Sequence, residues 1–188
     1  MDNSVTVIRR KRKTIKIGIN PDGSVYICAP LFLSDSEIEE FYNSRQRWIK
    51  VHSEKLKNQK EIIEKVIKMT DDEIIDLKNR AREYITERVE FYAKIMEVEY
   101  SGISIKVMKS RWGSCSSKKR LNFNCLLMLA PKESIDSVVV HELCHLKEMN
   151  HSKRFYELVY RYFPNYDIHH AWLNKNGTEI LARVFDLI

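Results

Sequence analysis

No stretch of this sequence approaches the roughly 18 apolar residues that a membrane-spanning helix requires, so it offers no candidate transmembrane segment. The first residues, Met1 to Ser4, lack the charged-then-apolar order of a signal peptide. We therefore expect a cytoplasmic protein without membrane contact. The four cysteines form no CxxC pair. In a reducing compartment we expect them to be free thiols and not a disulfide framework.

Disorder of the whole chain is also excluded, because hydrophobic residues make up 44% of the 188 residues, near the globular norm of roughly 45–50%. No internal repeat or low-complexity linker divides the chain. We expect a single domain over residues 1–188, with an N-terminal hairpin and helical region over 1–100 and a core that carries the chemistry over 101–188. The formal net charge of +6 suits either an anionic partner or simple solubility.

The first half of the chain combines strand and helix signals. Alternating apolar and polar residues predict strands over 4–33, with a tight turn at residues 20–23. Two capping boxes, each a Ser or Thr followed three residues later by Glu, predict helices. One spans about 35–57 and the second starts after Thr70. The charged segment 58–69 between them is ambiguous.

The second half repeats this mixture in the order strand, loop, strand and helix. We expect strands over 102–108 and 121–129, separated by a loop over 111–120. Apolar residues at three- and four-residue spacing predict a helix from Ser134 and another from Ser152 that ends near a proline. Strands first and helices later indicate an α+β fold, in which a small antiparallel sheet packs on helices.

Two basic segments are candidates for an anionic partner. Residues 9–13 are all Arg or Lys, and so are residues 118–120. Nucleic acid is a partner of the type that such runs bind. For the first run we favour a solvated hairpin edge, and we keep nucleic-acid association as an accessory role only.

The most informative segment is the HExxH sequence that begins at His141. Two histidines four apart on a helix, His141 and His145, point the same way and can hold one Zn²⁺. Glu142 can then act as general base toward a metal-bound water without ligating the metal itself. The apolar run 138–140 places the motif on a helix, where Cys144 is expected to be a small buried residue.

A catalytic zinc site needs a third protein ligand and one open position. His151 follows His145 by six residues, which on an unbroken helix would leave it on another face. Asn150 supplies a plausible break in the helix, and Ser152 can cap the next one. We prefer His151 as the third ligand, and the rival ligands are Glu157, His169 and His170.

An ordered set of motifs resembles a known family. The motifs are Arg111 to Ser116, Leu121 to Asn124, Leu129 to Pro131, Val139 to His145 and Asn150 to Ser152. They look like those of the YgjP-like metal-dependent hydrolases, usually described as YgjP-like metallopeptidases, which are similar to SprT-like and Wss1-like zinc proteases. The motifs are dense over about 105–165, and the N-terminal hairpin also fits.

The resemblance implies a gluzincin-like core in which a small sheet packs on the HExxH helix. It implies His141, His145 and His151 as the metal ligands and Glu142 as the catalytic base. We therefore predict a zinc-dependent hydrolase, most simply a metallopeptidase that acts on peptides or unfolded proteins. An extended peptide would pair with a strand edge, for which we expect the open edge of residues 122–126.

Two alternatives stay open at this point. Some members of the family that the sequence resembles are associated with nucleoside triphosphate (UTP) pyrophosphatase activity, and a loop with Arg111 and residues 118–120 could meet a polyphosphate. The second alternative is a non-catalytic binding module with a structural zinc, for which Cys115 or Cys144 would be the fourth ligand. As candidate substrate contacts we name Arg111, Asn122 and Asn124.

Overall fold

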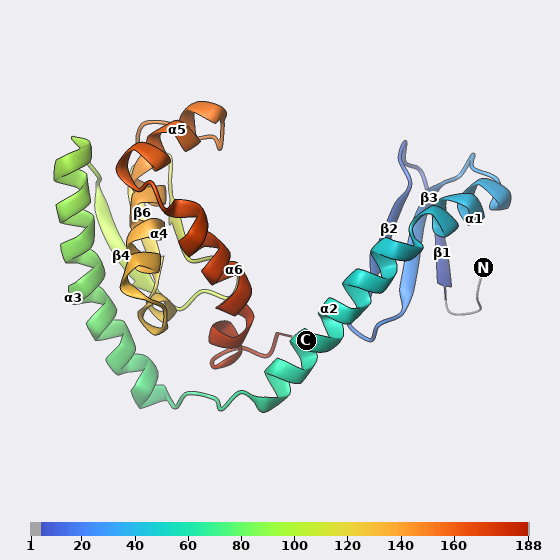
Figure 1. Ribbon diagram of the computed structural model, residues 1–188, viewed down its shortest axis with the longest axis horizontal. Coiled ribbons are helices and arrows are strands. Elements are labelled where there is room, and N and C mark those ends of the chain that lie inside the picture. The colour runs from blue at the N-terminus through green and yellow to red at the C-terminus, as the bar shows by residue number, and fades with distance from the viewer. Residues whose placement is uncertain (1–4, 188) are drawn as a thin grey trace. The chain divides into compact units, whose positions relative to one another are not determined.

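The chain divides into two compact units. A computed structural model describes residues 5–187 (Figure 1), so the interpretation of residues 1–4 lies outside it. The first unit runs to Lys65 and the second covers Val66–Leu187. This division falls after Lys65, whereas the sequence predicts that the core begins after residue 100. That the whole chain acts as one domain stays a prediction.

The first unit is built on a three-stranded sheet, within the described residues, that has the order β1-β3-β2. Its strands are β1 (Val5–Arg10), β2 (Lys16–Ile19) and β3 (Val25–Pro30). The predicted hairpin is confirmed: β2 and β3 are antiparallel, and the turn between them closes where Gly23 N donates to Asn20 O at 2.9 Å. Strand β1 lies parallel to β3 on its other side.

Two helices follow the sheet, where the sequence predicts one. They are α1 (Asp35–Ser44) and α2 (Gln46–Lys65), and the chain leaves helical geometry at Arg45, where φ is −107° and ψ is 7°. The ambiguous residues 58–65 therefore belong to a helix. Ile38 of α1 is fully buried together with Ile27 and Ala29 of β3, and this contact forms the small core of the unit.

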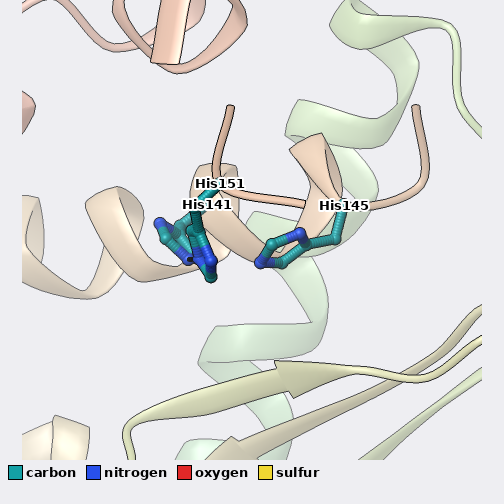
Figure 2. Close-up of side chains that lie close together, drawn as sticks. All are labelled: His141, His145 and His151. Atoms are coloured by element: carbon teal, nitrogen blue, oxygen red, sulfur yellow. Dashed lines mark hydrogen bonds between the residues drawn. The ribbon is translucent and has the colours of Figure 1, made fainter. Parts of the chain in front are cut away.

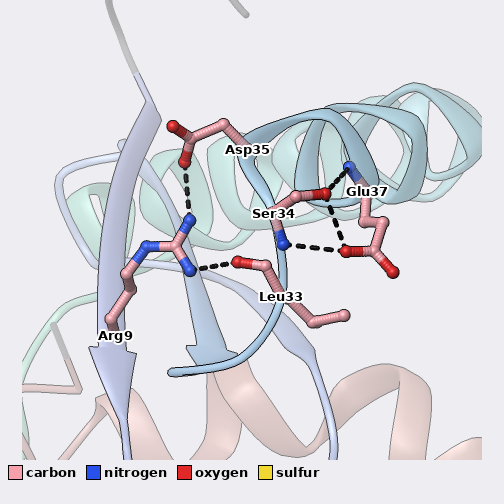
Figure 3. Close-up of polar contacts among 5 residues, drawn as sticks. All are labelled: Arg9, Leu33, Ser34, Asp35 and Glu37. Carbon is pink, nitrogen blue, oxygen red and sulfur yellow. Dashed lines mark hydrogen bonds and ion pairs between the residues drawn. The ribbon is translucent and has the colours of Figure 1, made fainter.

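The predicted capping box at the start of α1 is present (Figure 3). Ser34 Oγ accepts from Glu37 N, while the Glu37 carboxylate accepts from Ser34 N at 2.8 Å. Arg9 of β1 pairs with Asp35 at 2.6 Å and also donates to the carbonyl of Leu33. One member of the basic run thus ties the strand to the helix start. Nucleic-acid association of this run stays a prediction.

The second unit begins with the long helix α3 (Asp71–Met96), which the second capping box predicts correctly. One face of α3 packs into the core, through Leu77, Ala81, Ile85, Val89, Ala93 and Met96. The ion pair of Arg88 with Asp136, in which both nitrogen–oxygen distances are 2.8 Å, ties α3 to the next helix in the core. Burial and this pair together hold α3 against that helix.

The sheet of the second unit corrects three sequence expectations. Its strands are β4 (Gly102–Lys106), β5 (Gly113–Cys115) and β6 (Arg120–Asn124), in the order β4-β6-β5. The strand expected over 121–129 ends at Asn124, and a 3₁₀ helix, η1 (Cys125–Leu129), follows. The expected loop 111–120 contains the edge strand β5. Because β6 is paired on both sides, the prediction of an open edge at residues 122–126 is wrong.

Three helices complete the second unit. They are α4 (Lys132–Cys144), α5 (Lys153–Tyr162) and α6 (Tyr166–Ala182). Helices α5 and α6 both contact α4, which also contacts β5. The predicted α+β class is confirmed, but each sheet combines one parallel with one antiparallel pair and is not purely antiparallel. Within residues 5–187, no helix is both long and apolar enough to traverse a bilayer.

Candidate metal centre

The C-terminal turn of α4 carries the HExxH residues. Val139 and Val140 are fully buried, so α4 is anchored in the core immediately before the motif. The helix ends at Cys144, and His145 is its C-cap. Ser152 caps α5 by accepting from Phe155 N at 3.2 Å. The chain therefore turns between the two helices, as the predicted break requires, and this turn returns His151 to α4.

The three imidazoles converge (Figure 2). One ligand nitrogen from each of His141, His145 and His151 lies within 4.8 Å of the others, and among residues 5–187 these side chains form the group that could hold a metal ion. Nε2 of His141 and Nε2 of His151 are 3.0 Å apart. A tetrahedral zinc site with Zn–N near 2.0–2.1 Å separates its nitrogens by roughly 3.3 Å. The donor set fits such a metal.

Neighbouring groups orient two of these rings. His141 Nδ1 lies 2.9 Å from the Tyr166 hydroxyl of α6, and His145 Nδ1 lies 3.2 Å from the carbonyl of Glu148. A proton on each Nδ1 would leave each Nε2 free as an acceptor for the metal, which is the usual arrangement around metal-binding histidines. The Glu148 carbonyl can only accept, so it favours a proton on Nδ1 of His145, whereas the Tyr166 hydroxyl can either donate to or accept from Nδ1 of His141.

Burial favours the neutral form of two of the three histidines, His141 and His145. It lowers the pKa of His141 to about 3, and the neighbouring His145 and His151 add to this effect. Burial also lowers the pKa of His145, against the opposing effect of the Glu148 carbonyl. Because a metal binds the neutral imidazole, these shifts favour binding near neutral pH.

Glu142 lines the same cavity as the three histidines but is itself buried. Its side chain is 5% exposed, and Oε2 has no hydrogen-bond partner within the described residues. Burial raises the pKa of Glu142 to about 8, and the charge of Arg111 opposes this rise. An unpaired buried carboxyl group reduces stability, and a strongly shifted pKa in a cleft is typical of functional sites.

The edge strand β5 lies directly against Glu142. A Cβ at Gly113 would approach Glu142 Oε1 to 2.6 Å, so only glycine lets the strand lie this close. A cavity of about 250 Å³ lies between β5 and the three histidines. A second, of about 160 Å³, lies toward α6, and the two share Gly113, His141 and Glu142. The cleft therefore extends to both sides of Glu142.

The three residues predicted to contact a substrate have different surroundings in the structure. Arg111 is exposed near Glu142 but lines neither cavity. Asn122 is partly buried and donates to Ser114 Oγ at 3.2 Å. Asn124 is fully buried; its amide donates to the carbonyls of Met108 and Arg111 and accepts from Leu126 N. Asn124 therefore supports the backbone and offers no exposed atom to a substrate.

The rival ligands lie outside the histidine group. Glu157 is exposed and pairs with Lys153 at 3.9 Å. His169 Nδ1 lies 3.4 Å from Ser134 Oγ. His170 stacks on Tyr166, with ring centres 5.4 Å apart, and lines the smaller cavity. Cys144 is buried, as expected, and its pKa rises to about 12 for that reason.

Sequence reasoning missed Tyr166 and the role of Gly113. Tyr166 begins α6, a helix that the pattern did not predict, and its nearness to His141 depends on how α6 packs on α4. Gly113 lies within the motif that supports the family resemblance. Its glycine identity was the available signal for a close approach of backbone to another group.

Comparisons with known proteins agree with this geometry. A family model described as "YgjP-like, metallopeptidase domain" matches residues 13–76 and 73–176. A protein of Escherichia coli (strain K12) described as UTP pyrophosphatase is 34% identical over 65 residues, which are 35% of this chain and 39% of that protein. The chain thus matches well under half the length of this relative.

Two solved structures of metallopeptidase zymogens are also similar to part of the chain. Abylysin of Pyrococcus abyssi is 19% identical with a TM-score of 0.45, over 50% of this chain and 95% of that one. Jannalysin of Methanocaldococcus jannaschii is 26% identical with a TM-score of 0.45, over 50% of this chain and 96% of that one.

Proposed function

The chain belongs to the YgjP-like metallopeptidase family, and on that premise we propose that it is a zinc-dependent peptidase with Glu142 as general base. The observation that carries the proposal is the convergence of three imidazoles beside a buried carboxyl group and an open strand edge. The family supports a metal-dependent hydrolase. The metal, the substrate and the residue roles are the proposed part.

His141, His145 and His151 would hold the metal through Nε2, and Tyr166 and the Glu148 carbonyl would keep their rings in place. When bound, zinc would supply polarisation of the scissile carbonyl and a lower pKa for the attacking water. With three protein donors in the group, one position is left for the reactants. Neither Cys115 nor Cys144 lies in this group, and this argues against a closed structural site.

Glu142 is placed to move protons. A positive charge at the three histidines would stabilise its carboxylate and counter the effect of burial on its pKa. Because Glu142 lines both cavities, its carboxylate would accept a proton from water and return it to the leaving amine. Because Gly113 has no side chain, the backbone of β5 lies against the Glu142 carboxyl group and limits its orientation.

The edge of β5 favours an extended peptide as substrate. Among residues 5–187, strand β5 pairs with β6 on one side only, and its other side borders the cleft that contains the histidines. A peptide can add to such an edge through backbone hydrogen bonds, which place its carbonyl groups in register with the site. The open edge therefore belongs to β5 and not, as the sequence predicted, to residues 122–126.

A triphosphate lacks comparable partners. Several cations must converge to position three phosphates, yet neither cavity is lined by Lys or Arg. Arg120 donates to Ser104 Oγ on β4, and Lys118 and Lys119 are exposed in the turn before β6. Because one relative is described as a UTP pyrophosphatase, the experiment below also tests hydrolysis of UTP.

The test compares unfolded proteins, peptides and UTP as substrates of the zinc-loaded wild type, Glu142→Gln and Glu157→Gln. Glu157→Gln is the matched control, because Glu157 is exposed and outside the site. We expect peptide cleavage that Glu142→Gln reduces by about 10²–10⁴-fold, at unchanged zinc content, and that the control retains. Equal turnover by all three proteins, or hydrolysis of UTP without any peptide cleavage, would overturn the proposal.

A further inference from the structure

The smaller cavity beside Glu142 extends away from the metal centre. It holds about 160 Å³ and lies between the Trp112 loop, helix α4 and helix α6. Val138 of α4 and Leu173 of α6 are buried residues of its wall, and Trp112 also lines it. His141 borders the cavity, but His145 and His151 do not.

Apart from the unpartnered Glu142 Oε2, three polar side chains of this wall have hydrogen-bond partners within the described residues. Ser137 Oγ donates to the Ser134 carbonyl at 2.8 Å, and the Tyr166 hydroxyl is bonded to His141. Asn174 lies 3.3 Å from His170 Nδ1. These groups offer a guest no unpaired partner, so burial of apolar surface is the main gain available from filling the cavity.

Glu142 defines which part of a peptide would reach this cavity. A base that returns its proton to the leaving amine must have the leaving half of the substrate beside it. The larger cavity contains all three histidines, whereas the smaller one continues past Glu142 and away from His145 and His151. The first side chain of the leaving half is therefore the group nearest to the smaller cavity.

The size of the cavity suits a large apolar side chain. An apolar protein cavity of roughly 150 Å³ accommodates benzene, and this one holds about 160 Å³. We infer that it binds an aromatic or large aliphatic side chain of the residue that follows the scissile bond. This inference rests on the proposed peptidase function and adds a substrate preference to it.

Helix α6 supports two residues of the cavity wall. Gly177 of α6 lies against the Trp112 ring, where an added Cβ would be 3.1 Å from a ring carbon. Leu173 is on the same helix, one turn earlier. Because Trp112 and Leu173 are both fixed by α6, the cavity can select among side chains by size.

The first measurement is cleavage of a peptide library in which only the residue after the scissile bond varies. We expect Phe and Leu to exceed Ala in kcat/KM by about tenfold or more. Leu173→Phe fills the cavity with its larger ring and should bring Phe peptides toward the rate of Ala peptides. Leu181→Phe is the matched control, because Leu181 is also on α6 but does not line the cavity.

The second measurement needs no activity. Phenylalaninamide, the leaving half of a cleaved amide, should shift the indole N–H resonance of Trp112 in the zinc-free protein, whereas alaninamide should not. The chain has three tryptophans, so Trp112→Phe assigns the signal. Leu173→Phe should abolish the shift, and Leu181→Phe should retain it.

The two measurements separate the inference from the function on which it rests. Peptide cleavage without preference for the following residue would overturn the inference and leave the peptidase intact. If no peptide is cleaved, the proposed function fails. A Trp112 shift that Leu173→Phe abolishes would then still support the cavity as an apolar binding site, and no shift would overturn it.

Discussion

Replacing Gly113 with alanine should misplace the proposed base without touching the metal ligands. The three atoms nearest to the added methyl group all belong to Glu142, at 2.6, 2.7 and 2.9 Å. Ordinary contacts of a Cβ begin at 3.4 Å, so Oε1 must retreat by about 0.8 Å. Displacement of a catalytic group by roughly 1 Å can cost about 10²-fold in rate, and we expect kcat to fall by that factor.

The assay is a double-mutant cycle with Glu142→Gln. Because both substitutions act through the same carboxyl group, their effects on kcat should not add. Gly113→Ala should therefore cost far less than about 10²-fold in the Glu142→Gln protein. The overpacked methyl group should cost about 1–3 kcal/mol of stability, which urea unfolding measures. Zinc content should stay at the wild-type value.

Two results would refute this reasoning. An unchanged kcat in Gly113→Ala would show that the position of Glu142 does not limit turnover. Additive losses in the double variant would show that Gly113 acts elsewhere, for example in backbone pairing of β5 with the substrate.

Three further predictions concern the ligands and the scaffold. Tyr166→Phe should weaken zinc binding by about 10–100-fold, measured by chelator competition, because His141 Nδ1 loses its partner; wild-type affinity would contradict this. Arg88→Ala should lower the unfolding free energy by about 1.5–3 kcal/mol, because Arg88 and Asp136 are both largely shielded from solvent. Arg80→Ala removes an exposed pair and should change it by under about 0.5 kcal/mol; equal losses would count against this prediction. In metal-free protein, the stabilisation from protonated Glu142 is present below its ordinary pKa of 4.5 and is lost as pH rises through about 8. The unfolding free energy of the wild type should therefore fall over this pH range, and that of Glu142→Gln should fall less. Equal slopes of unfolding free energy against pH, measured by urea unfolding, would contradict this prediction.

Local signals account for the parts of the fold that the sequence predicted well. A capping box involves residues three positions apart, so the starts of α1 and α3 follow from the sequence alone. The turn between α4 and α5 is similar, because Ser152 is a local cap. This is why the sequence could predict that His151 returns to His141 and His145.

Tertiary contacts explain the parts that the sequence did not predict. The end of β6 depends on Asn124. Its side-chain amide donates hydrogen bonds to the carbonyls of Met108 and Arg111, which lie earlier in the chain, and these bonds favour η1 over a longer strand. Strand β5 is too short to show alternation. Helix α6 contains Gly177, and glycine is a poor helix former. The glycine is needed there because the Trp112 ring lies against it.

X-ray absorption at the zinc edge of the zinc-loaded wild type tests the central claim most directly, because it reports the atoms bound to the metal. We predict nitrogen ligands at about 2.0–2.1 Å that fit three imidazoles and one further oxygen, and loss of one imidazole in His151→Ala. Sulfur at about 2.3 Å, as a ligand from Cys115 or Cys144 would give, or a spectrum unchanged in His151→Ala, would contradict the three-histidine site.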